Sequence, residues 1–175
     1  MDAISTLALD HRRIRLLLSE FAQLNDRAKF RKTALADQFC LALTIHTRLE
    51  EEFLYPACGA IGATDLIEEG IDERATIREL VARIAGAEPG NQGYDEDVEA
   101  LTEVVEQHVL AQENDLFERL RRTSLDLETL SIAMRRRSAQ LGGTAESVFA
   151  PLEALAEVPN RLPNRQGSAA KLRIV

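Results

Sequence analysis

Four long segments of the sequence repeat apolar residues at steps of three and four positions, and this spacing constrains the fold more than any other feature. The segments span about residues 2–24, 28–57, 65–84 and 95–122, and a shorter one spans 125–141. Such steps place apolar side chains on one face of an α-helix, and no stretch shows the alternation of a strand. Because the connections are short, neighbouring helices are expected to run antiparallel. The sequence therefore predicts an all-α fold, an antiparallel four-helix bundle with a short fifth helix.

The same spacing predicts which side of each helix faces the core. The expected inward positions are Ile4, Leu7, His11, Ile14, Leu18 and Phe21 in the first segment; Phe39, Leu43, His46, Glu50, Phe53 and Ala57 in the second; Ile77, Val81 and Ile84 in the third; and Val98, Leu101, Val105, His108, Gln112 and Leu116 in the fourth. Asp95 is expected to cap the N-terminus of the fourth helix.

The C-terminal end of the sequence differs in composition from the rest. Residues 1–141 are expected to form the bundle and its fifth helix, and residues 142–175 a tail that is partly disordered. The last 17 residues contain Arg161, Arg165, Lys171 and Arg173 without an acidic residue, and their Pro-Asn-Arg repeat lacks helical periodicity. We therefore expect a flexible basic tail on an acidic domain.

Composition excludes several classes of function. The net charge of −8 argues against broad nucleic-acid binding, and the absence of an apolar run of 18 residues argues against a membrane span. The N-terminus does not read as a signal peptide. Cys40 and Cys58 fall on one predicted helix, where roughly 27 Å would separate them, so no disulfide is expected. Together these features predict a cytoplasmic protein.

The three histidines of the sequence, His11, His46 and His108, each lie on the inward face of a different predicted helix. A single inward histidine is more often a hydrogen-bonded core residue than a ligand. Here Glu50 follows His46 by one helical turn, so three imidazoles and a carboxylate are directed at one region. Helical bundles build iron sites from ligands of this kind on facing helices. The pattern therefore favours a metal site.

The sequence resembles the hemerythrin-like, or HHE cation-binding, domains. The stretches that carry the resemblance are "DAISTLALDHRRIRLLL", "IHTRLEEEFLYPA", "HVLAQENDLFERL" and "DLETLSIAMRRRSAQL", which cover residues 2 to about 141. The resemblance implies a four-helix bundle around a non-haem di-iron centre. It also implies roles in oxygen or redox sensing, iron handling, or peroxide and nitric oxide chemistry. Matched residue by residue, the implied metal ligands are His11, His46, Glu50 and His108.

Two positions depart from the family pattern. The third helix has Glu73-Arg74 where the family usually has a Glu-His pair, and Gln112 replaces a carboxylate of the fourth helix. Glu113 offers a substitute carboxylate, rotated by about 100° around the helix. Arg74 would repel a second metal; it either pairs with Glu50 or extends outward along its stem. One iron per chain is therefore favoured over two.

Three functions remain open at this stage. The favoured one is a metal-binding protein that holds non-haem iron for oxygen or redox sensing or for iron handling, with dioxygen or another small diatomic as ligand. The alternative is a metal-free descendant that acts as a protein interaction module, with an unidentified partner. An enzyme that consumes peroxide or nitric oxide is the least favoured, because the di-iron ligand set is incomplete. Tyr55 is expected to pack at a helix end rather than to donate a hydrogen bond.

Overall fold

The computed structural model describes residues 1–64, 67–68 and 70–142, so the predicted tail lies outside the described residues. The α-helices are α1 (Ala3–Ala22), α2 (Lys29–Leu49), α3 (Tyr55–Ala60), α5 (Ile71–Gly86), α6 (Tyr94–Ala111), α7 (Phe117–Arg121) and α8 (Leu127–Gln140). Two π-helical turns, η1 (Glu50–Leu54) and η2 (Gln112–Leu116), join α2 to α3 and α6 to α7. The bundle thus consists of four long helical rods. Two are the single helices α1 and α5, and two contain a π turn, namely α2–η1–α3 and α6–η2–α7.

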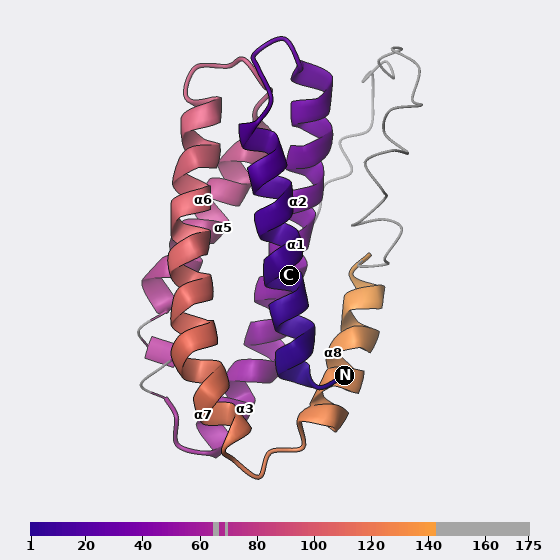
Figure 1. The fold of residues 1–175 in the computed structure, drawn as a ribbon, viewed down its shortest axis with the longest axis vertical. Helices are drawn as coiled ribbons and strands as arrows, with labels where there is room; N and C mark the ends of the chain where they lie inside the picture. Colours follow the sequence, from indigo (N-terminus) through magenta and orange to yellow (C-terminus); the bar gives the residue numbers. More distant parts are fainter. Residues whose placement is uncertain (65–66, 69, 143–175) are drawn as a thin grey trace.

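The helices form a four-helix bundle in which consecutive rods run in alternating directions (Figure 1). Helix α1 packs against α2 and α6, and α5 completes the ring by packing against α2 and α6. No strand occurs in the part of the chain that the structure describes. The all-α bundle that the periodicity predicts is therefore confirmed. None of the described helices is long and apolar enough to cross a membrane.

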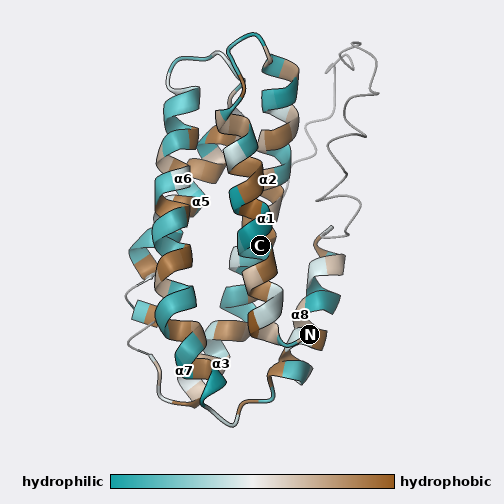
Figure 2. Cartoon of the chain, viewed as in Figure 1, coloured by the Kyte–Doolittle hydropathy of each residue, from teal (hydrophilic) through white to brown (hydrophobic). Residues whose placement is uncertain are grey.

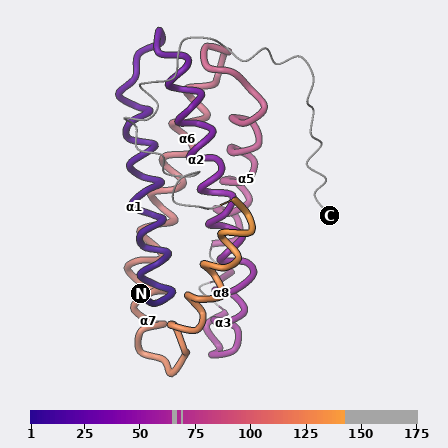
Figure 3. Tube along the Cα trace, turned by 90° about the vertical axis from the view of Figure 1, so that its right-hand side faces the viewer, coloured from indigo at the N-terminus to yellow at the C-terminus, as the bar shows by residue number. Residues whose placement is uncertain are grey.

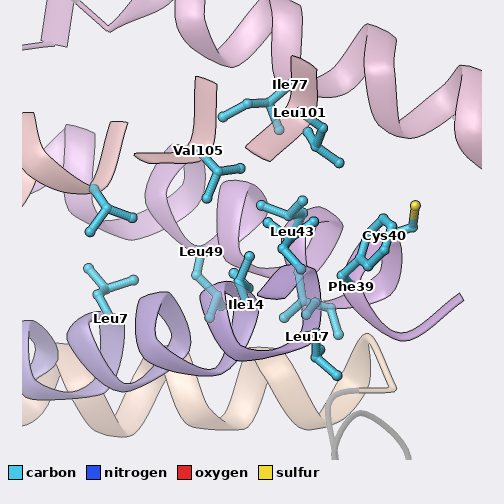
Figure 4. Packing of buried hydrophobic residues seen from close by; sticks show 14 of the residues in the cluster. Leu7, Ile14, Leu17, Phe39, Cys40, Leu43, Leu49, Ile77, Leu101 and Val105 are labelled. Atoms are coloured by element: carbon cyan, nitrogen blue, oxygen red, sulfur yellow. The ribbon is translucent and has the colours of Figure 1, made fainter. Parts of the chain in front are cut away.

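The core lies between the four rods, where their apolar faces meet. Figure 2 shows apolar and polar residues on every helix of the bundle, as expected of amphipathic helices with one buried face. Ile14, Leu43 and Val105 come from three different helices and point into the shared interior (Figure 4). All six predicted inward positions of α1 are buried, including His11. The predicted face of α1 is therefore confirmed.

The inward face of the second rod differs from the prediction after Glu50. Phe53 and Ala57 are only partly buried, whereas Leu54 and Cys58 are fully buried. A π turn contains one extra residue, so it rotates the face of the following helix by one position. The backbone N–H of Tyr55 bonds to the carbonyl of Glu50, which closes this turn. The prediction fails because it assumed a continuous α-helix.

Two smaller differences concern α5 and α6. Leu80 rather than Val81 is fully buried on α5. Helix α6 begins at Tyr94, after Gly93 in a left-handed conformation with φ of +82°, so Asp95 is not the N-cap. Asp95 instead accepts a 2.5 Å hydrogen bond from Nζ of the buried Lys32. This ion pair joins α6 to α2 across the bundle end.

The short helix α8 lies across α1 and α2 (Figure 3). On its inner face, the side chain of Met134 is fully buried, and the hydroxyl of Ser131 lies 3.0 Å from the hydroxyl of Thr6 on α1. At the other side of α8, Nε of Arg137 donates to Glu52 at 2.7 Å. The fifth helix is therefore part of the packed domain.

We expect Met134→Ala to lower the free energy of unfolding by about 2–4 kcal/mol, because it removes a buried side chain and leaves a cavity. Ile132→Ala on the same helix is the matched control, since Ile132 is 54% exposed, and should change stability by less than about 0.5 kcal/mol. Urea denaturation followed by circular dichroism measures both. Equal effects of the two substitutions would show that α8 does not dock as described.

Candidate metal centre

The bundle interior brings together the four residues that the sequence predicts as ligands. His11 lies in the middle of α1, His46 is on α2, Glu50 begins η1, and His108 lies near the end of α6. One ligand atom from each of the four lies within 4.8 Å of the others. The Nε2 atoms of His11 and His46 are 3.2 Å apart. The predicted set therefore converges on one point.

The carboxylate of Glu50 occupies the centre of this group and has no exposed surface. Its Oε1 lies 3.3 Å from Nε2 of His46 and 3.3 Å from Nε2 of His108. Gln112 donates to Oε1 from its amide, and the hydroxyl of Tyr55 donates to Oε2 at 3.0 Å. A buried carboxylate is tolerated only with such partners.

The protonation states follow from burial and the nearest charges. Burial would raise the pKa of Glu50, but His46 and His108 hold it well below its usual value. Burial opposes protonation of His46 as well, yet Glu50 and Asp10 raise its pKa to about 10. Burial and the neighbouring His46 lower the pKa of His11 to about 2. These shifts favour a protonated His46 beside an ionised Glu50, and a metal ligated by His46 would displace that proton.

Each histidine has a carboxylate near the nitrogen that points away from the centre. Glu113 Oε1 lies 2.9 Å from Nδ1 of His11. Asp10 and Glu73 lie farther away, with an oxygen 3.9 Å from Nδ1 of His46 and of His108, respectively. A carboxylate accepts from Nδ1–H, so Nε2 of a neutral ring keeps its lone pair. The arrangement turns Nε2 of His11 toward the centre as a ligand.

The geometry of the four side chains fits one metal ion. Two ligand atoms on the same metal can lie at most ~4.2 Å apart when each bond is about 2.1 Å, so a group that spans up to 4.8 Å needs to contract by roughly half an ångström to one ångström. Among the described residues, Nε2 of His108 is buried without a hydrogen-bond partner. A buried polar nitrogen without a partner is costly, and coordination to a metal would satisfy it.

Arg74 points into the bundle, contrary to the expectation that it extends outward. It is 6% exposed and its guanidinium lies 4.3 Å from the centre of the Tyr55 ring. Nη2 donates to the carbonyl of Ile67 at 3.0 Å. The expected pair with Glu50 is not formed, because Tyr55 and Gln112 supply the donors to that carboxylate. Arg74 thus places a fixed positive charge beside one half of the centre.

Glu113 and Tyr55 also differ from their predicted roles. Glu113 was expected as a substitute metal ligand, but it contacts the outward nitrogen of His11. Tyr55 was expected to pack only, but it donates to Glu50. Proline cannot donate to a helical carbonyl, so Pro56 is a local signal for the π turn that brings Tyr55 inward. Nothing comparable in the sequence marks the π turn at Gln112.

Comparisons with known proteins agree with this geometry. A crystal structure of a hemerythrin HHE cation-binding domain-containing protein from Mycobacterium kansasii matches with a TM-score of 0.70 and 25% identity, over 90% of this chain and 93% of that one. A DNA nickase from Nostoc sp. strain PCC 7120 is 27% identical over 151 residues, which are 83% of this chain but 42% of that protein. This chain therefore spans less than half of the nickase.

The fold is a helical bundle, and its buried histidine–carboxylate group is a candidate cation site. The hemerythrin HHE cation-binding domain matches residues 2–120. The chain belongs to this family. The match ends in α7, so α8 lies outside the matched region. The resemblance seen in the sequence had extended to about residue 141.

We expect Tyr55→Phe to destabilise the chelator-treated protein by about 1.5–3 kcal/mol, because it removes a hydrogen bond to a buried carboxylate. Tyr94→Phe is the control, since it removes the hydroxyl of another buried tyrosine, which lies at the start of α6 and away from the centre. Denaturant titration of the two variants measures the difference. A loss for Tyr55→Phe no larger than that for Tyr94→Phe would contradict the role of Tyr55.

Proposed function

We propose that the chain binds one non-haem iron through His11, His46, Glu50 and His108, and serves in oxygen or redox sensing or in iron handling. The observation that carries the proposal is the convergence of three imidazole nitrogens and one carboxylate, all buried, within 4.8 Å. Membership of a cation-binding family supports the metal. Imidazoles with one carboxylate and open coordination positions are a ligand set typical of non-haem iron.

The preference for one iron rests on charge. The half of the centre next to α5 contains Arg74 and Gln112, a cation and a neutral amide. A second metal needs negative ligands and would be repelled by the guanidinium. On the other side, Glu50 and the neutral Nε2 of His11 supply what a single divalent ion requires.

The side chains of this chain have distinct tasks in the proposal. Glu50 supplies the negative charge, and Tyr55 and Gln112 hold its two oxygens in place. Glu113 orients His11. A cavity of about 180 Å³ reaches His108 and Gln112 from the surface beside Asp115. It offers a small diatomic such as dioxygen a route to the iron.

A metal-free interaction module is the second candidate, and the contacts of Glu50 favour it to some degree. Both oxygens of the carboxylate have protein donors or cationic neighbours, so the buried charge is compensated without a metal ion. Iron content separates the two functions, because the module predicts none.

We expect the protein to contain about one iron per chain when purified from iron-supplemented cells, and His46→Ala and Glu50→Gln to lose it. Cys40→Ala is the matched control, because Cys40 is a buried residue of the same helix outside the cluster. Elemental analysis of folded protein gives the result. Iron absent from the unaltered protein, with no rise in melting temperature on adding ferrous iron, would support the metal-free module instead.

We expect Glu113→Gln to weaken iron binding by about 10- to 100-fold, because the orienting carboxylate of a ligand histidine is lost. Glu106→Gln provides the control on α6, since Glu106 pairs only with the exposed Arg15 in the described contacts. Competition with a chelator of known affinity measures both constants. An unchanged constant for Glu113→Gln would show that Glu113 does not orient His11.

A further inference from the structure

The cavity beside the centre has an unusual wall. It has a volume of about 180 Å³, which corresponds to several water molecules, and is lined by Tyr55, Gly70, Glu73, Arg74, His108, Ala111, Gln112, Asp115 and Leu116. Arg74 is more than nine-tenths buried in this wall. In the part of the chain that the structure describes, its guanidinium contacts a carbonyl and an aromatic ring but forms no ion pair.

The guanidinium lies directly against the backbone of Gly70. A Cβ atom at residue 70 would lie 2.5 Å from Nη1 of Arg74, so an alanine there would make the flexible end of the arginine side chain shift. Gly70 has a φ of −89°, a conformation that any residue adopts, so backbone strain does not explain the glycine. Gly70 and Arg74 both line the cavity, so such a shift would move the guanidinium within the cavity wall.

Gln112 lines the same cavity, but its amide group is turned to the core. Gln112 donates to Glu50 through its amide nitrogen, and its Oε1 is buried without a hydrogen-bond partner among the described residues. The donors that the cavity wall offers therefore come from Arg74. A buried guanidinium needs a counter-charge, and none of the described residues forms an ion pair with Arg74.

We propose that this cavity binds a small, planar, singly charged oxyanion, with Arg74 as its cationic partner. A guanidinium presents parallel N–H donors that match two oxygens of one planar anion. Bicarbonate, formate and nitrate all present two such oxygens in one plane. The proposal does not depend on the identity of the metal.

The acidic residues of the cavity set its selectivity. Asp115 is exposed at the rim, and Glu73 is partly buried beside His108. Their charges repel anions, and they repel a doubly charged anion about twice as strongly as a singly charged one. The cavity should therefore exclude sulfate and hydrogen phosphate while it accepts bicarbonate.

The test is calorimetric titration of the protein as purified, at constant ionic strength, with iron content measured in the same sample. Bicarbonate, formate, nitrate and sulfate are the probes, and nitrate is included because it is a poor metal ligand. We expect saturable binding of the three planar anions at one site, with sulfate at least tenfold weaker.

Three variants and two control variants assign the site to Arg74. Arg74→Gln should abolish anion binding, and Arg74→Lys should weaken it at least tenfold because the charge remains but the planar fork is lost. Arg78→Gln is the control for loss of a cation, since Arg78 is an exposed residue of α5 paired with Glu51. Gly70→Ala should weaken binding by displacing the guanidinium, whereas Gly86→Ala, with open space around its Cβ, should not.

The proposal is overturned if the unaltered protein shows no saturable binding of any planar anion, which would leave water as the occupant. It is also overturned if Arg74→Lys and Gly70→Ala, both folded by circular dichroism, bind nitrate as the unaltered protein does. These results are independent of iron, because a protein without iron that binds bicarbonate through Arg74 still supports the anion site.

Discussion

The buried carboxylate of Glu50 is the constraint on which the interior of this protein depends. A charge with no exposed surface must be compensated within the bundle, and side chains from three of its four long helical segments contribute. His46 and His108 approach one oxygen, Tyr55 and Gln112 donate to the carboxylate, and Arg74 packs on the Tyr55 ring. The polar groups of the core thus form one connected set, and a change in any of them alters the environment of the proposed iron ligands.

The two π turns connect this chemistry to the backbone. One begins at Glu50 and the other at Gln112, each four residues after a histidine of the centre. Short π turns occur most often at functional sites, and here each one re-aims the residues that follow it. After Glu50 the extra residue brings Tyr55 and Leu54 inward in place of Phe53. The backbone irregularity is therefore part of the centre, since it delivers the hydroxyl that holds the carboxylate.

Much of this arrangement could be predicted from the sequence, because helical periodicity reports which face of a helix is buried. Periodicity alone places His11, His46, Glu50 and His108 on helix faces that point toward one region. The positions of Glu113 and Arg74 could not be predicted in this way. Periodicity tells which helix face a residue is on but not which partner its side chain contacts, and competition among Tyr55, Gln112 and Arg74 for Glu50 is decided by three-dimensional packing. The predicted inward positions after Glu50 are wrong because the π turn inserts one extra residue into the helix. The only local signal of that turn in the sequence is Pro56.

The claim that one iron sits among these four side chains is tested most directly by anomalous diffraction at the iron edge from crystals of the iron-loaded protein. The account predicts a single anomalous peak per chain, bonded to Nε2 of His11, His46 and His108 and to the carboxylate of Glu50. A folded, iron-containing protein whose peak lies elsewhere, or one with a second peak next to Arg74, would contradict it.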